Sequence, residues 1–214
     1  MKRRLLSMIA ALIIMRSLLP AQNGDFIRYG TDPTYLSDFV HRVYTSSDGL
    51  PGMTVVSLIQ DKKGYIWLGT YDGLVRFDGV EFTVFSRYTD QKYNFASART
   101  VYEDSDGNLW VGHNGEGLTC IQADGSIVKR ETENGLPDNK VGAIVEDTKG
   151  NIWIGTSGGI RYIAPSGSLI APEGLAELGM DRINVARILC DQDGRIWIST
   201  GNEEGIFVYE NDRF

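Results

Sequence analysis

One short pattern occurs four times along the chain and constrains its fold more than any other feature. Each copy reads Asp-x-x-Gly-x-(Ile/Leu)-Trp, and the copies end at Trp67, Trp110, Trp153 and Trp197, the only tryptophans among 214 residues. Successive tryptophans are 43, 43 and 44 residues apart. A fixed period of this length is typical of repeat architectures, so the sequence predicts a molecule built from four similar units.

Each unit contains short apolar runs that read as β-strands. In the first unit they cover residues 55–60, 65–69, 74–77 and 82–85, and they are rich in Val, Ile, Phe and Trp and bounded by Gly, Asp or Asn. Four antiparallel strands per unit predict an all-β fold, a β-propeller of which four four-stranded blades are seen. One small sheet cannot bury both its faces, so we expect the blades to stack, with the tryptophan of each covering its neighbour.

The turn between the first two strands has an expected mechanical role. The aspartates accept backbone N–H groups across the turn, and the glycines adopt positive φ. These structural repeat residues are Asp61, Gly64, Trp67, Asp104, Gly107, Trp110, Asp147, Gly150, Trp153, Asp191, Gly194 and Trp197. No bidentate glutamate follows them at the spacing of a calcium loop, so we expect no metal and no cofactor. Cys120 and Cys190 lie in units that are not neighbours, and we expect two buried thiols.

The repeat also sets the expected boundaries. The blades cover residues 54–86, 98–131, 140–171 and, incompletely, 184–214, and residues 39–45 are predicted to form an orphan outer strand. Either the orphan strand seals a four-bladed ring or the blades form an arc of a larger one. We favour the arc, since six to eight blades fill a ring with large sheets more easily. Such an arc exposes an apolar blade face.

The first 21 residues read as an export signal. A cationic start, Met1-Lys2-Arg3-Arg4, precedes an apolar run that is too short to span a bilayer comfortably. We expect a signal peptide over residues 1–21, with an uncleaved anchor as the alternative, and an N-terminal lead over 22–38. The formal net charge of −7 argues against a nucleic-acid partner.

Several segments together resemble the two-component regulator propeller repeat. They are Gly49-Leu50-Pro51, residues 61–70, residues 73–77 and residues 135–162, and the resemblance extends over 39–214. It implies a periplasmic, seven-bladed sensor propeller that precedes a membrane-linked output such as a histidine kinase. The present chain would then be a fragment, the front of a receptor. Gly112-His113 and Ser199-Thr200 depart from the usual Gly-Thr, and both changes precede the second turn of a blade.

The resemblance implies which residues would meet a ligand. In propellers the loops between the second and third strands share one face with the entries to the first strands, commonly the ligand face. The polar candidates there are Tyr71, Arg99, His113, Asn114, Lys140, Arg182, Asn184 and Arg187. Arginines suit the carboxylates of acidic sugars, and a tyrosine can stack on a sugar ring. Most of these residues could equally be solvated loop positions.

Three functions remain open. The first is a non-catalytic sensor of a small molecule or oligosaccharide, whose other partners are further blades, the output domain or a second copy in a homodimer. The second is an enzyme, since the repeat is also similar to streptogramin-lyase propellers. Such an enzyme needs a general base, and His113 is the one plausible candidate. The third is a scaffold that docks a protein partner.

Overall fold

The computed structural model describes residues 42–50, 54–89, 91–93, 95–179, 182–201 and 205–214. The chain divides into two units, 1–43 and 44–214, and the second contains all the strands. The expected signal peptide at 1–21, the lead at 22–38 and residues 39–41 lie outside the described residues. Among the residues that are described, no helix has the length and apolar character needed to cross a membrane.

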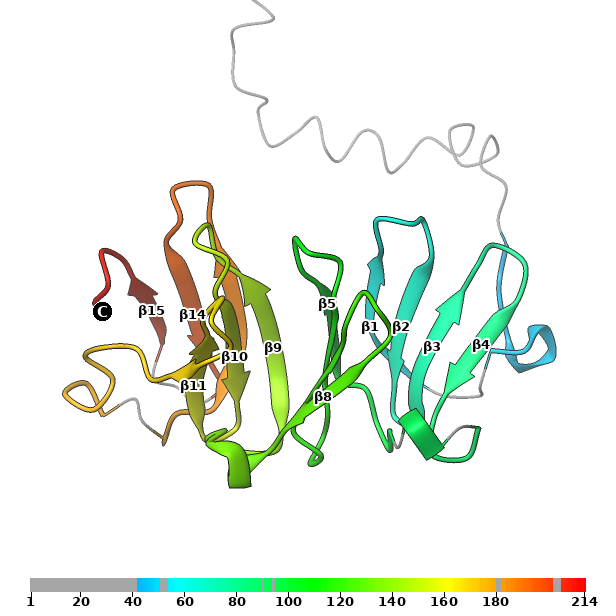
Figure 1. The fold of residues 1–214 in the computed structure, drawn as a ribbon, viewed down its shortest axis with the longest axis horizontal. Coiled ribbons are helices and arrows are strands. Elements are labelled where there is room, and N and C mark those ends of the chain that lie inside the picture. The colour runs from blue at the N-terminus through cyan, green and yellow to red at the C-terminus, as the bar shows by residue number, and fades with distance from the viewer. Residues whose placement is uncertain (1–41, 51–53, 90, 94, 180–181, 202–204) are drawn as a thin grey trace, which may run out of the picture. The chain divides into compact units, whose positions relative to one another are not determined.

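Four antiparallel sheets follow one another in chain order, each with its strands in sequence order, which confirms the all-β propeller fold (Figure 1). Blade 1 contains β1 (Val55–Gln60), β2 (Ile66–Thr70), β3 (Gly73–Phe77) and β4 (Phe82–Phe85). Blade 2 contains β5 (Thr100–Glu103), β6 (Leu109–Gly112), β7 (Leu118–Ile121) and β8 (Ile127–Arg130). Blade 3 contains β9 (Val141–Glu146), β10 (Ile152–Thr156), β11 (Gly159–Ile163) and β12 (Leu169–Ile170), and blade 4 contains β13 (Val185–Cys190), β14 (Ile196–Thr200) and β15 (Ile206–Tyr209).

The aspartate of each repeat ties its turn to its tryptophan. In blade 1, Asp61 Oδ1 accepts the backbone N–H groups of Lys63 and Tyr65 at 3.0 and 2.8 Å, and Asp61 Oδ2 accepts the Trp67 indole N–H at 2.8 Å. The other three blades repeat these contacts at 2.7 to 3.0 Å. The glycine that closes each turn has φ between 79° and 90°. The expected roles of the aspartates and glycines in the turns are therefore confirmed. The bond to the indole N–H gives each aspartate a second role.

Three of the four tryptophans, Trp67, Trp110 and Trp153, lie between blades, as expected. We call the face of a blade that carries its tryptophan the tail face, because it contacts the next blade, and the opposite face the head face. Trp153 is 1% exposed and packs with Val185, Ile196 and Ile198 on the head face of blade 4. Trp197, on the tail face of blade 4, is 37% exposed. Its exposure shows that no described blade covers this face.

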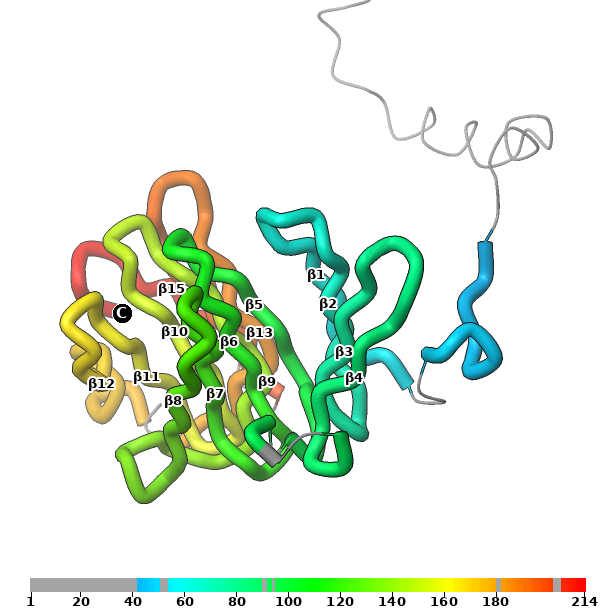
Figure 2. The backbone as a smooth tube through the Cα atoms, turned by 45° about the vertical axis from the view of Figure 1, so that its right-hand side comes forward, coloured from blue at the N-terminus to red at the C-terminus, as the bar shows by residue number. Residues whose placement is uncertain are grey.

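The inner strands pack in the order β1, β5, β9, β13. Figure 2 shows β1 of blade 1 facing β5 of blade 2. Blade 4 has three strands, and no described segment adds a fourth strand to β15. Residues 42–45, the described part of the expected orphan strand, are in no strand. The sealed four-bladed ring is therefore not formed by the described residues, and the blades form an open arc.

The segment that enters blade 1 nevertheless resembles the one that enters blade 3. The short 3-10 helix η1 (Ser46–Asp48) is capped by Thr45 and ends at Gly49 with φ 91°. The helix η3 (Thr132–Asn134), which follows the outer strand β8, has the same cap geometry and ends at Gly135 with φ 96°. A third such helix, η2 (Gln91–Tyr93), precedes blade 2. Residues 45–50 therefore have the geometry of a loop that leaves an outer strand.

Both cysteines are free thiols. Cys120 is buried, and burial raises the pKa of its thiol to about 12. Cys190 is only partly buried, so the expectation of two buried thiols is correct for Cys120 alone.

The indole bond generates the first prediction. Replacing Asp104 by Ala should lower the free energy of unfolding by about 2 to 3 kcal/mol, because the buried Trp110 N–H and the turn N–H groups lose their acceptor. Urea denaturation measures the loss. Asp191→Ala is the matched control, since water can reach the half-exposed Trp197. Equal losses in the two variants would contradict the role of burial.

Candidate ligand-binding site

The inner strands begin with irregular backbone at the end of the blades opposite the repeat turns. The pairing register shifts between Val55 and Ser57 in β1, and between Val185 and Arg187 in β13. Before β5, the Arg99 N–H donates to the Gly112 carbonyl at 2.7 Å while Thr100 also pairs with Gly112. Two residues opposite one is the arrangement of a β-bulge, which bends a strand and redirects a side chain. The bulges thus determine which side chains each blade places at this end of its first strand.

A cavity of about 260 Å³ lies between these strand starts. All four inner strands or their entries contribute, and the lining residues are Val56, Ser57, Tyr71, Arg99, Thr100, Gly142, Ala143, Ile144, Arg187 and Ile188. The lining contains two arginines and no carboxylate, in a chain with a net charge of −7. Such a cavity favours an anion.

Three of the eight predicted residues meet in this cavity. The Arg99 guanidinium lies against β9, where a Cβ added to Gly142 would be 3.7 Å from Arg99 Nε. Arg187 Nη1 donates to the Ala186 carbonyl at 2.7 Å, which uses one of its five donors. Tyr71, in the turn between β2 and β3, is 54% exposed. Two cations and one phenol ring are therefore open to a ligand.

Four other predicted residues lie at the same end of the blades but do not line the cavity. Asn114 and Lys140 are exposed and form an isolated β-bridge that joins the β6–β7 loop to the entry of β9. The Asn184 carbonyl accepts the Gly201 N–H at 2.7 Å, and Arg182 is exposed just before it. The structure does not bring these four residues together with Arg99.

His113 is a buried structural residue and is not accessible to a ligand. It is 1% exposed, its Nδ1–H donates to the Ser97 carbonyl at 2.5 Å, and its Nε2 accepts from Thr119 Oγ1 at 2.9 Å. In blade 3 the same position holds Thr156, whose hydroxyl donates to the Gly159 carbonyl at 2.8 Å. Both ring nitrogens of His113 are used, so we remove it from the ligand residues. Burial lowers the pKa of His113 below its usual value.

Sequence reasoning did not identify the remaining residues of the cavity wall. Ser57, Thr100 and Ala143 occupy one repeat position, four residues before the turn aspartate, and Arg187 is their counterpart in blade 4. Aligning that position across the units would have found the wall. Its bulged neighbours, Arg99 and Gly142, come one residue earlier.

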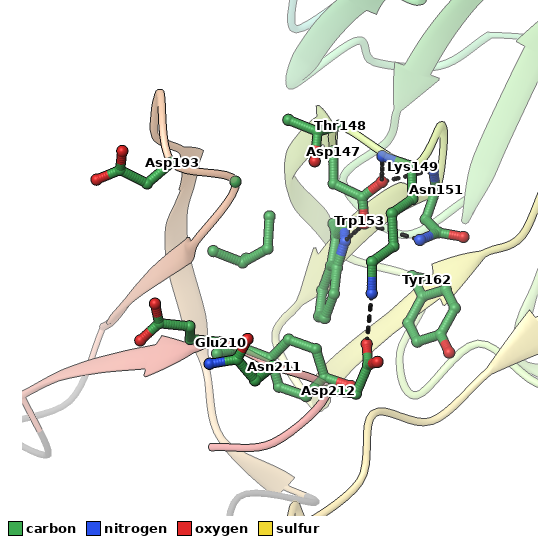
Figure 3. Close-up of a pocket in the computed structure, with 13 residues that line it drawn as sticks. Asp147, Thr148, Lys149, Asn151, Trp153, Tyr162, Asp193, Glu210, Asn211 and Asp212 are labelled. Atoms are coloured by element: carbon green, nitrogen blue, oxygen red, sulfur yellow. Dashed lines mark hydrogen bonds and ion pairs between the residues drawn. The ribbon is translucent and has the colours of Figure 1, made fainter.

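A second cavity, of about 240 Å³, lies at the opposite end, between blades 3 and 4. Figure 3 shows Lys149 extending past Trp153 toward Asp212, and the two charged groups are 2.7 Å apart. A comparable cleft of about 220 Å³ lies between blades 2 and 3. Because the cleft recurs at successive blade contacts, it follows from blade packing. In the part of the chain that the structure covers, no three His, Cys, Asp or Glu side chains gather to hold a metal.

Comparison with known proteins agrees with the repeat. Residues 49–72, 92–115, 135–158 and 179–202 match the family model of the two component regulator propeller. A curated relative from Formosa agariphila, named Histidine kinase P4, is 45% identical over 49 residues, which are 23% of this chain and 4% of that protein.

Solved structures share the fold. The extracellular domain of the system BT4673 from B. thetaiotaomicron, named as a one component system, has a TM-score of 0.63 at 24% identity, over 81% of this chain and 24% of that one. The extracellular domain of the hybrid two component system BT3049 from the same organism has a TM-score of 0.59 at 18% identity, over 80% and 30%. Virginiamycin B lyase from Staphylococcus aureus has a TM-score of 0.53 at 18% identity, over 74% and 56%. The chain thus spans under a third of either extracellular domain.

The buried histidine predicts a pH-dependent stability. The unfolded chain protonates His113 near pH 6.5, whereas the folded chain does so only at lower pH. The unfolded state therefore binds more protons below about pH 6.5, and the free energy of unfolding should fall as the pH drops from about 7 to about 5. Urea denaturation across this range should show a flatter dependence for His113→Thr, which places the usual repeat residue there. Parallel curves for the two proteins would exclude His113 as the cause.

Proposed function

The chain is built from repeats of the two-component regulator propeller family, and on that basis we propose that it is the extracytoplasmic ligand-sensing region of a two-component-type signalling receptor. It binds an anionic small molecule, such as an acidic oligosaccharide, and performs no chemistry on it. The observation that carries the proposal is the central cavity, which joins Arg99, Arg187 and Tyr71 from separate blades.

The chemistry of the lining supports this ligand class. A carboxylate of an acidic sugar pairs well with a guanidinium, in two parallel hydrogen bonds where the geometry allows. The Tyr71 ring offers an apolar face for the C–H groups of a pyranose ring, and Ser57 and Thr100 offer hydroxyl partners. A ligand that touched both arginines would also bridge blades that are distant in the sequence.

The fold is compatible with the lyase-like alternative, but the residues that line the cavity give it little support. A general base must reach the substrate, and the cavity lining contains no His, Asp, Glu or Lys. His113, the base that this alternative requires, is buried and engaged on both nitrogens. These contacts favour binding over catalysis.

The rest of the receptor is part of the proposal. We place the chain outside the cytoplasm, in the periplasm of a bacterium, since the similar solved domains are named as extracellular. Further blades complete the ring around the cavity, and a membrane-linked output domain carries the signal.

Charge removal at the cavity tests the proposal. Arg99→Ala and Arg187→Ala should each weaken binding of a uronic-acid oligosaccharide about 10- to 100-fold, as expected for the loss of a charged hydrogen-bonding partner. Isothermal titration calorimetry measures the affinity. Arg182→Ala, which removes an exposed arginine outside the cavity, is the matched control and should leave the affinity unchanged.

Two results would contradict the proposal. One is an affinity for the acidic oligosaccharide that neither cavity variant changes. The other is conversion of the bound sugar to a new product, which chromatography of the recovered ligand would reveal.

A further inference from the structure

Blade 3 carries the smallest side chains where the inner strands enter the central cavity. Five residues before the turn aspartate, the four blades have Val56, Arg99, Gly142 and Ala186. At the next position they have Ser57, Thr100, Ala143 and Arg187. Because β9 packs between β5 and β13, the blade with the smallest pair lies between the two blades that supply the arginines.

Packing does not require the glycine at position 142. A Cβ added to Gly69 would lie 2.7 Å from the Ala98 carbonyl oxygen, and one added to Gly112 would lie 2.6 Å from Thr100 Cγ2, so both must be glycine for the blades to pack. A Cβ added to Gly142 would meet its nearest neighbours at 3.6 to 3.8 Å, which is ordinary van der Waals contact. Its φ lies outside the left-handed region as well. Alanine would therefore fit, although glycine inside a strand is the less stable choice.

The space beside Gly142 opens between the two arginine-bearing blades. The added Cβ would lie 3.7 Å from Arg99 Nε and 3.8 Å from Arg99 Cζ of blade 2, and 3.6 Å from the Val185 carbonyl oxygen of blade 4. Arg187 follows Val185 by two residues and lines the same cavity as Arg99 and Gly142. A glycine in a strand often marks a place where a ligand approaches the backbone closely. The missing side chain therefore leaves room for a group beside the Arg99 guanidinium.

The charges around this space favour an anion that both arginines share. Within the described residues, the Arg99 side chain donates no hydrogen bond, and Arg187 uses only Nη1, toward the Ala186 carbonyl. The cavity lining contains no carboxylate to neutralise them. Two like charges that line one small cavity repel each other, and an anion between them removes that repulsion.

We propose that Gly142 is the specificity-determining residue of the cavity, and that the space beside its Cα holds one carboxylate of the ligand, which Arg99 and Arg187 bind together. The inference deepens the proposed function and rests on it. The unit recognised in the cavity is then a single acidic sugar, because both cations act on the same group. A side chain at position 142 would occupy the place of that carboxylate.

The first experiment fills this space in two steps. Gly142→Ala and Gly142→Val should weaken binding of a galacturonic acid trisaccharide about 10-fold and about 100-fold, since each added group takes volume from the ligand carboxylate. Isothermal titration calorimetry measures the affinity. Ala176→Val, which adds bulk at an exposed alanine outside the cavity, is the control and should leave the affinity unchanged.

The stability of the same variants separates a binding role from a structural one. Gly142→Ala should unfold at the same urea concentration as the unchanged chain or at a higher one, because alanine fits the backbone and restricts the unfolded chain. Weaker binding without lower stability is the expected signature of a residue that makes room for a ligand. A lower urea midpoint for Gly142→Ala would show that packing needs the glycine, and it would overturn the inference.

A double-mutant cycle tests whether the two arginines share one carboxylate. Arg99→Ala, Arg187→Ala and the double variant are titrated with the same trisaccharide. Residues that share a partner are coupled, so the loss of affinity in the double variant should differ from the product of the two single losses. A loss equal to that product would mean that each arginine binds a separate acidic group, which overturns the inference.

The outcomes also separate this inference from the proposed function. If the unchanged chain does not bind the acidic trisaccharide, both fall together. If the arginine variants weaken binding while Gly142→Val binds as tightly as the unchanged chain, the proposed function stands and the role of Gly142 is refuted.

Discussion

The carboxylate of the repeat aspartate is the contact on which the rest of the structure depends. One side chain satisfies two turn N–H groups and the indole N–H of the tryptophan six residues later. A buried indole N–H without an acceptor is costly, so this bond lets a large apolar ring sit deep between two blades. In blade 3 the ring is almost fully covered, and the apolar core between blades 3 and 4 forms around it. The turn, the tryptophan ring and the contact with the next blade are thus linked through one carboxylate, and this arrangement recurs along the chain.

The constant turn end leaves the opposite end free to vary. At that end the first strand of a blade begins with a β-bulge. A bulge turns adjacent residues of the strand in different directions, so the repeat position alone does not decide which side chain reaches the cavity. Blade 2 has an arginine at the bulge and blade 4 has one at the next position, and both reach the same cavity. The cavity lining therefore contains two arginines and no carboxylate, although the chain as a whole has a net charge of −7.

His113 shows how a residue can look functional in a sequence and be structural in the fold. Its position departs from the repeat, and a histidine beside a Gly-rich loop is typical of a base or a ligand. In the structure the ring replaces the threonine hydroxyl of the other blades, and it joins the segment before β5, through the Ser97 carbonyl, to Thr119 in strand β7. Arg99, by contrast, belongs to no recognisable motif in the sequence, yet it lines the cavity.

The sequence by itself determined the repeat, the strands and the turn roles, because those depend on local spacing: strand period, turn chemistry and the position of each tryptophan are set within a single unit. It also brought Arg99, Arg187 and Tyr71 onto one list with five residues that do not line the cavity. Only the tertiary structure separated them, since the cavity arises where the bulged starts of four strands converge. The indole bond to the aspartate likewise depends on side-chain direction, and so do the hydrogen bonds between blades from the Lys62 N–H to Glu103 and from the Ser105 N–H to Glu146. Spacing along the chain does not fix that direction until the sheets have twisted and packed.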